Sequence, residues 1–174
     1  MKSSIALIGF MGVGKTVVGK ALAEKLNKKF VELDYLIEQQ AGKTIPEIFE
    51  QDGEIAFREL EIEVTEEVAR NKNQVIACGG GIVLNQINID RLKRDSIVVY
   101  LTASPGVILK RVSNGGDRPV LKTINLPIIQ ELLKFRQPFY ERAADFKINT
   151  SRASINSIAD QIISRIKQHE DFSL

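Results

Sequence analysis

The chain has 174 residues, of which 44% are hydrophobic and 26% charged, and this ordinary balance excludes wholesale disorder. A chain of this length supports one hydrophobic core, and no stretch rich in proline, glycine or serine divides it, so we expect a single domain over residues 1–174. The net charge of +2 is too small for the large excess of basic residues that is typical of proteins that bind nucleic acid, which argues against nucleic acid as a partner.

Membrane insertion, disulfide formation and histidine catalysis are also disfavoured. No apolar run approaches the roughly 18 residues that a spanning helix needs, so we predict no membrane partner and a cytoplasmic protein. The one cysteine, Cys78, has no second cysteine to pair with and is expected in the core. The one histidine, His169, lies in a polar stretch, where we expect a solvated side chain rather than a general base.

The first predicted element is a strand at Ile5–Ile8, and it leads directly into a phosphate-loop motif. Residues 9–16 read G-F-M-G-V-G-K-T and fit G-x-x-x-x-G-K-[ST] at every fixed position. Apolar residues at helical spacing follow from Val18 to Leu26, which supplies the strand-to-helix context of the motif. The backbone would cradle phosphate oxygens, with Lys15 as the positive charge and Thr16 as a ligand for Mg²⁺. A chance glycine-rich turn is the weaker alternative.

A second strand and a helical region follow. Residues 30–34 alternate apolar and acidic side chains and predict a strand that ends on the carboxylate of Asp34. A short helix is expected over residues 35–40, and Thr44 with Glu47 forms a capping-box pattern that starts another helix at Ile45.

Gly53 interrupts this region before a longer helix over residues 54–70. Its predicted core stripe consists of Ala56, Leu60 and Val64. Arg58 lies off the centre of that stripe and is therefore expected to face a cleft.

The third predicted strand, Gln74–Cys78, stops abruptly at Gly79, Gly80 and Gly81. Three glycines after a buried strand maximise the entropy lost on folding, so we favour a ligand that approaches the backbone closely over a merely flexible turn.

The fourth strand is expected at Ile97–Leu101, followed by a helix with Ser104 as N-cap that runs to about residue 112. Residues 113–123 hold two glycines, Arg118 and a proline, and we interpret them as a mobile lid. A further helix is expected to be interrupted at Pro138, with a bend just after Arg136.

Phe146–Asn149 is the fifth expected strand, and an amphipathic helix over residues 155–166 closes the chain. Strands that alternate with helices predict an α/β fold: a five-stranded parallel sheet with helices on both faces. Ligands of such sheets gather at the carboxyl ends of the strands, where Gly12, Asp34 and Gly80 are expected to meet.

Four residues from separate elements indicate the second substrate. Arg58 and Arg136 could hold a carboxylate with forked donors, Asp34 could accept hydrogen bonds from hydroxyls, and the backbone at Gly80 admits a ring. Together they indicate a small polyhydroxylated acid. For either arginine alone, a surface ion pair is the commoner explanation.

These residues resemble the bacterial shikimate kinases, which have a phosphate-loop fold of the nucleoside-monophosphate-kinase type. The resemblance covers nearly the whole chain and rests on residues 9–16, Asp34, 52–54 with 57–58, 79–81, 118–121, 136–140 and 144–145. It implies transfer of phosphate from ATP to the 3-hydroxyl of shikimate with one Mg²⁺ ion, in the pathway to chorismate and aromatic amino acids. We expect a monomer that binds ATP and shikimate.

The resemblance also implies roles for single residues. The substrate-binding region spans about residues 34–62, and the lid about 113–123. The implied shikimate contacts are Asp34, Arg58, Gly79, Gly80, Gly81 and Arg136, with Phe49, Phe57 and Glu61 in the pocket wall. The implied ATP contacts are Gly12, Val13, Gly14, Lys15, Thr16, Val17, Arg111, Arg118 and Arg152. Glu32 stands where the family usually has an aspartate that helps to hold the waters of the magnesium ion.

Phosphoryl transfer requires mainly positioning and charge neutralisation. We expect Lys15, Thr16-bound Mg²⁺ and Arg118 to offset charge, and Asp34 to orient the attacking hydroxyl and take its proton late. Two alternatives stay open: a kinase of another small hydroxy acid or of a nucleoside monophosphate, and a nucleotide-gated binding module without turnover.

Overall fold

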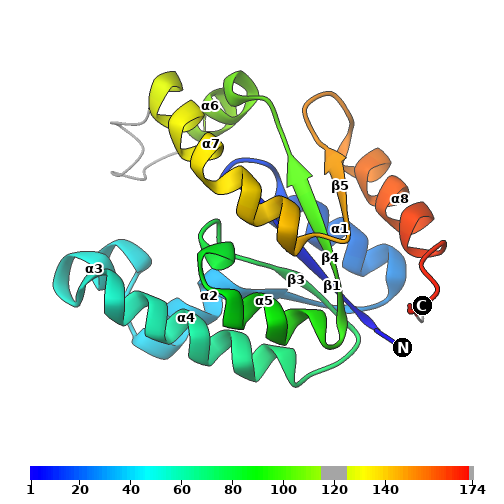
Figure 1. Ribbon diagram of the computed structural model, residues 1–174, viewed down its shortest axis with the longest axis horizontal. Helices are drawn as coiled ribbons and strands as arrows, with labels where there is room; N and C mark the ends of the chain where they lie inside the picture. Colours follow the sequence, from blue (N-terminus) through cyan, green and yellow to red (C-terminus); the bar gives the residue numbers. More distant parts are fainter. Residues whose placement is uncertain (115–124, 173–174) are drawn as a thin grey trace.

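The computed structural model describes residues 1–114 and 125–172, and its centre is a sheet of parallel strands (Figure 1). Within the described residues the sheet has five strands in the order β2-β3-β1-β4-β5. The strands are β1 (Ser4–Ile8), β2 (Lys29–Glu32), β3 (Gln74–Ala77), β4 (Ser96–Thr102) and β5 (Phe146–Asn149). The predicted α/β fold class is confirmed.

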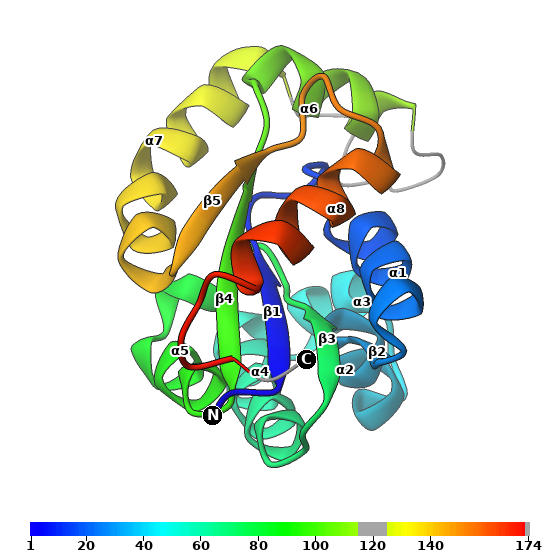
Figure 2. The ribbon, with the colours of Figure 1, turned by 90° about the vertical axis from the view of Figure 1, so that its right-hand side faces the viewer.

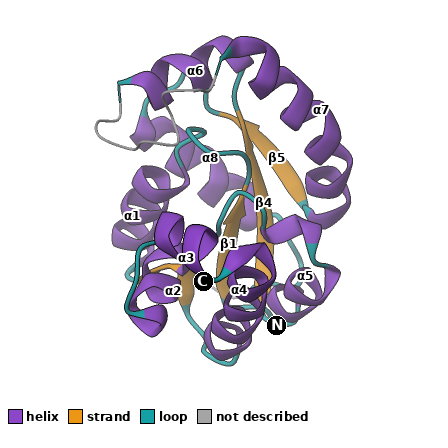
Figure 3. Cartoon of the chain, turned by 90° about the vertical axis from the view of Figure 1, so that its left-hand side faces the viewer, coloured by secondary structure: helices purple, strands orange, loops and turns teal. Residues whose placement is uncertain are grey.

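Helices cover both faces of this sheet. They are α1 (Lys15–Leu26), α2 (Leu33–Ala41), α3 (Ile45–Gln51), α4 (Gly53–Ala69), α5 (Gln86–Lys93), α6 (Pro105–Ser113), α7 (Leu126–Ala143) and α8 (Ile155–Ile166), with a 3₁₀ turn η1 (Ile82–Leu84). Helices α1 and α8 lie side by side over one face (Figure 2). Figure 3 shows α2 to α5 on the opposite face.

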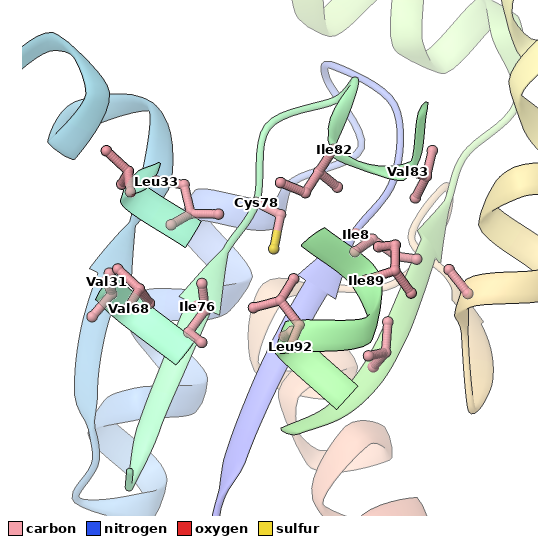
Figure 4. Close-up of a cluster of buried hydrophobic side chains, with 14 of the residues drawn as sticks. Ile8, Val31, Leu33, Val68, Ile76, Cys78, Ile82, Val83, Ile89 and Leu92 are labelled. Atoms are coloured by element: carbon pink, nitrogen blue, oxygen red, sulfur yellow. The ribbon is translucent and has the colours of Figure 1, made fainter. Parts of the chain in front are cut away.

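The side chains of β1 point alternately to the two faces of the sheet, and the core accordingly consists of two clusters. Ile5 and Leu7 point to the face of α1 and α8, whereas Ala6 and Ile8 point to the face of α2 to α5, and all four are fully buried. Figure 4 shows part of the second cluster, with Cys78 between Ile76 and Ile82. A strand buried on both faces favours apolar residues on both of its sides, which explains the apolar run Ile5–Ile8 of β1.

The capping box that opens α3 is present as predicted. The Thr44 hydroxyl accepts from the Glu47 backbone N–H at 3.4 Å, and the Glu47 carboxylate accepts from the Thr44 backbone N–H at 2.8 Å. Asp52 separates α3 from α4, which begins at Gly53 with φ of 86°. The helical region that follows β2 is thus built from these local signals.

Asp34 lies in the first turn of α2, so its predicted position at the end of a strand is wrong. Strand β2 ends at Glu32, which is also the N-cap of α2, and the helix begins at Leu33. Because no loop separates this strand from the helix, no glycine, proline or turn residue marks the boundary in the sequence. The carboxylate therefore projects from a helix N-terminus, where negative charge is favourable.

The core stripe expected for α4 is also wrong in part. Of Ala56, Leu60 and Val64, only Val64 is buried. The buried face consists of Phe57, Glu61, Val64, Thr65 and Val68. The stripe is thus shifted around the helix, and Arg58 is half-buried at its margin.

Two further differences concern helices. Residues 82–93, for which the sequence pattern predicts no element, form η1 and α5, with Asn85 as N-cap. Helix α7 continues through Pro138 to Ala143 rather than being interrupted there. Pro138 and Lys134 are both exposed, so water can satisfy the Lys134 carbonyl group that proline leaves without a backbone donor.

The chain ends and the expected lid complete the description. Lys2 pairs with Phe172 in a parallel bridge, so the described termini lie together (Figure 1). His169 is half-buried rather than fully solvated. The lid expected at residues 113–123 falls almost wholly outside the described residues. In the part of the chain that is described, no helix combines the length and the apolar character needed to cross a bilayer.

Candidate active site

The predicted site residues meet at the carboxyl-terminal edge of the sheet. The phosphate loop follows β1, Asp34 follows β2, the three glycines follow β3, and Arg136 comes from α7. Arg58 comes from α4, so three strand ends and two helices position these residues, as expected for a parallel α/β sheet.

The phosphate loop has the backbone that its glycines predict. Gly9, Gly12 and Gly14 have φ of 143°, 75° and 104°. At Gly9 a side chain is also excluded by space, since a Cβ atom would lie 2.3 Å from the Leu101 carbonyl oxygen. Gly14 is the N-cap of α1, and no side chain caps that helix end. The N-terminus of α1 is thus arranged as an anion site.

Lys15 is held by the loop itself. Its ammonium group donates to the carbonyl oxygens of Gly9 and Phe10 at 2.8 and 2.9 Å. Burial lowers the pKa of Lys15 from its ordinary value to about 8, and the nearby carboxylate of Asp34 opposes this shift. At pH 7 the side chain is therefore mainly charged, in a place where its charge is poorly solvated.

Thr16 and Glu32 connect α1 to the end of β2. The Thr16 hydroxyl donates to Glu32 Oε1 at 2.6 Å. A hydroxyl that donates its proton to a carboxylate keeps its lone pairs for a cation, so the pair fits a magnesium site of hard oxygen ligands. Among residues 1–114 and 125–172, no cluster of three His, Cys, Asp or Glu side chains could hold a metal ion alone. Phosphate oxygens and waters would have to complete the coordination.

Side-chain oxygens of Asp34 and Glu61 lie close to the backbone of Gly79. A Cβ atom on Gly79 would lie 2.7 Å from Asp34 Oδ1 and 3.5 Å from Glu61 Oε1. Glu61 is almost fully buried, and its Oε1 has no hydrogen-bond partner among the described residues. Burial raises the pKa of Glu61, while Arg58 acts in the opposite direction. The site thus brings two carboxyl groups to the bare backbone.

Arg58 lies against the third glycine. A Cβ atom on Gly81 would lie 2.7 Å from both terminal guanidinium nitrogens of Arg58. The guanidinium donates to Glu61 Oε2 at 2.9 Å and to the exposed Glu54 at 3.4 Å. It also stacks near the Phe57 ring. The closest neighbours of Gly79 and Gly81 are thus side chains of the site itself.

The two predicted wall aromatics form a pair near Arg58. The Phe49 and Phe57 ring centroids are 4.7 Å apart. Phe57 is buried, whereas Phe49 remains 40% exposed. The pair therefore gives an apolar wall that is partly open to solvent.

Arg136 reaches the middle glycine from α7. Its Nη1 donates to the Gly80 carbonyl oxygen at 3.4 Å, and its guanidinium lies over the Phe10 ring. Its Nε is buried without a hydrogen-bond partner within the described residues. Arg58 and Arg136 therefore flank the Gly79–Gly81 turn from two different helices.

The residues assigned to nucleotide contacts are only partly brought together. Arg111 donates to the carbonyl oxygens of Gly12 and Val13 at 3.3 Å and to the Thr150 carbonyl oxygen at 2.7 Å. Val17 lies exposed in the first turn of α1, and Arg152 is exposed after β5. Arg118 lies outside the described residues.

Thr150 is a structural member of the site that the sequence pattern does not predict. The buried hydroxyl of Thr150 donates to the Val13 carbonyl oxygen at 2.7 Å and accepts from Arg111 at 3.0 Å. It joins the end of β5 to the phosphate loop. The one sequence signal is a hydroxyl directly after the last predicted strand, and such a residue is too common to be distinctive.

Comparisons with known proteins agree with this geometry. A family model described as shikimate kinase matches residues 11–167. A shikimate kinase of Caldanaerobacter subterraneus subsp. tengcongensis is 45% identical over 161 residues, which are 92% of this chain and 94% of the relative. That of Thermodesulfovibrio yellowstonii is 44% identical over 171 residues, 98% of this chain and 96% of the relative.

Solved structures show the same similarity. The shikimate kinase from Acinetobacter baumannii, in complex with shikimate, has a TM-score of 0.90 and 37% identity, covering 98% of this chain and 96% of that one. The shikimate kinase from Aquifex aeolicus has a TM-score of 0.82 and 33% identity, covering 94% of this chain and 96% of that one.

Proposed function

The chain belongs to the shikimate kinase family, which makes it an ATP-dependent kinase, and we propose that it phosphorylates the 3-hydroxyl of shikimate to give shikimate 3-phosphate and ADP. This step belongs to the pathway to chorismate and the aromatic amino acids. The observation that carries the proposal is the placement of two arginines and Asp34 around Gly79–Gly81, beside the phosphate loop. A single domain, a monomeric state and a cytoplasmic location remain predictions.

The acceptor would lie against the bare Gly79–Gly81 backbone. Arg58 and Arg136 would hold its carboxylate, and Phe49 and Phe57 would border its ring. Asp34 would accept a hydrogen bond from the attacking hydroxyl and receive its proton as transfer completes. The Oε1 of Glu61 is an acceptor at the same backbone. Two arginines alone would bind phosphate as well as carboxylate, so our preference for a hydroxy acid over a nucleoside monophosphate is supported by the family relatives.

The donor nucleotide would lie on the phosphate loop. The backbone N–H groups at the start of α1 and the Lys15 ammonium would bind its outer phosphates. We propose that Arg118 contributes further positive charge. One Mg²⁺ ion, held by Thr16 and by waters near Glu32, would neutralise phosphate charge when bound. The loop carbonyls that hold Lys15 fix its direction before the nucleotide arrives.

The direct test is release of ADP measured with and without shikimate, with the product identified by phosphorus NMR. The proposal predicts ADP release that depends on shikimate. Nucleoside monophosphates and the methyl ester of shikimate are matched controls, because the ester keeps the hydroxyls and lacks the carboxylate. Equal turnover of the ester would contradict the role given to the two arginines.

The substitution Arg136→Lys is expected to raise KM for shikimate and to change kcat less. A point charge replaces a forked donor, so the ground state and the transition state lose the same contact. Steady-state kinetics at saturating ATP measure both constants. Arg142→Lys is a matched control, since Arg142 lies on the same helix and is exposed over the Phe139 ring. An unchanged KM in Arg136→Lys would place Arg136 outside the pocket.

The substitution Glu32→Ala is expected to raise the Mg²⁺ concentration that gives the half-maximal rate by roughly 10-fold. KM for shikimate should stay almost unchanged. The contact with Thr16 supports a role beside the metal ion rather than a simple ion pair with Lys15. Glu32→Asp should remain active, because water can fill the place of one methylene. Glu24→Ala, at an exposed glutamate of α1, is the control. Magnesium titrations that superimpose after normalisation would refute this role.

A further inference from the structure

Tyr140 is the largest fully buried side chain of the described residues, and its hydroxyl is at the site. It lies one helical turn after Arg136 on α7, so both side chains project from the same face. The hydroxyl donates a short hydrogen bond to the carbonyl oxygen of Gly80. Arg136 donates to the same oxygen at the longer distance of 3.4 Å. Within the described residues, these two groups are the donors to Gly80.

The ring of Tyr140 is fixed from the other side. It stacks on the ring of Tyr100, with centroids 4.9 Å apart and planes inclined by 19°. Tyr100 belongs to β4 and pairs in register with Ile8, the last residue of β1 before the phosphate loop. The hydroxyl of Tyr140 therefore has little freedom to move away from Gly80. Burial also raises the pKa of Tyr140 to about 12, so the hydroxyl keeps its proton and remains a hydrogen-bond donor near neutral pH.

The carbonyl group that Tyr140 binds belongs to an unusually free peptide. The peptide between Gly80 and Gly81 is flanked by two residues without Cβ atoms, so rotation of its plane meets little steric resistance. Because the peptide is trans, the N–H of Gly81 points opposite to the Gly80 carbonyl. The orientation of this one plane thus decides whether a donor or an acceptor faces each side of the turn.

We propose that Tyr140 is a positioning residue for the acceptor substrate: its hydroxyl holds the Gly80–Gly81 peptide in one orientation between Arg136 and Arg58. Gly80 lies next to Arg136 Nη1, and the Cα atom of Gly81 faces the guanidinium of Arg58. A peptide that rotates would present changed polar groups to the substrate and remove the acceptor of Arg136. The inference rests on the proposed placement of the acid at this turn.

The test is Tyr140→Phe, which removes the hydroxyl and keeps the stacked ring. We expect KM for shikimate to rise roughly tenfold, since one buried acceptor loses its main donor. KM for ATP should stay unchanged, because the phosphate loop is held by other contacts. In ¹⁵N-glycine spectra, the amide signals of residues 79–81 should broaden or split. Thermal unfolding of the variant checks that the stacked core remains folded.

Tyr100→Phe is the matched control, since it removes a hydroxyl from the partner ring. Tyr100 lines a groove with Gln137 and Glu141 and does not donate to Gly80. It should change neither KM nor the glycine signals. Equal effects in the two variants, or an effect of Tyr140→Phe on unfolding alone, would overturn the inference. If Arg136→Lys also left KM for shikimate unchanged, the proposed acceptor site itself would fail.

Discussion

Replacement of Lys15 by alanine is expected to lower kcat by roughly 10³-fold or more, because the charge opposite the transferred phosphoryl group is lost. The ammonium is directed by the Gly9 and Phe10 carbonyl groups, and no other side chain in the described loop can supply a positive charge there. Steady-state release of ADP at saturating substrates measures the loss. A variant with near-normal kcat would refute the assigned role.

The same replacement should leave the fold intact. Because burial lowers the pKa of Lys15, the folded protein holds the ammonium less readily than the unfolded chain does. The charge therefore costs stability at neutral pH, and its removal offsets the loss of the two hydrogen bonds to the loop. Lys20→Ala is the control, since Lys20 is an exposed lysine of the same helix, over the Phe30 ring. It should keep both kcat and the unfolding temperature.

The substitution Asp34→Asn is expected to lower kcat by roughly 10²- to 10⁴-fold and to change KM for shikimate less. The amide keeps the size of the carboxylate beside Gly79 but cannot take the proton of the attacking hydroxyl. Kinetics of the variant with saturating ATP separate the two constants. Asp52→Asn is the control, because Asp52 forms an exposed ion pair with Lys43 at 2.7 Å in the same helical region. A raised KM with unchanged kcat would reduce Asp34 to a binding residue.

Contiguous motifs were predictable from the sequence because one short segment contains all their information. The phosphate loop and the Thr44–Glu47 capping box depend on backbone geometry within a few residues, so their patterns determine their structures. The parallel direction of the strands also follows from the alternation of strands with helices, whereas their order in the sheet is known only from the structure. The three glycines after β3 indicated a ligand close to the backbone; the structure shows side-chain atoms of Asp34 and Arg58 beside Gly79 and Gly81, and the ligand stays a prediction.

Contacts between distant elements were not predictable from local pattern. Glu61 and Asp34 both place a carboxylate oxygen close to Gly79. The Thr150 hydroxyl donates to the carbonyl oxygen of Val13, a residue 137 positions earlier in the sequence. Such contacts arise only after the sheet has brought the strand ends together. The start of α2 was missed for a different reason: Glu32 serves both as the last residue of a strand and as a helix N-cap, and alternation detects only the first.

Helix α7 takes part in both hydrophobic cores. Ile129, Leu132 and Leu133 pack with the α1 and α8 cluster, whereas Phe139, Tyr140 and Ala143 pack with the α2 to α5 cluster. Helix α1, proposed to bind phosphate, and most of the proposed acceptor site thus lie in separate layers, and within the described residues α7 is the one helix that packs with both clusters. During divergence, the acid that is accepted could change through substitutions in a single layer while the nucleotide chemistry is inherited unchanged. Substitutions in α7, by contrast, would be constrained by both layers at once.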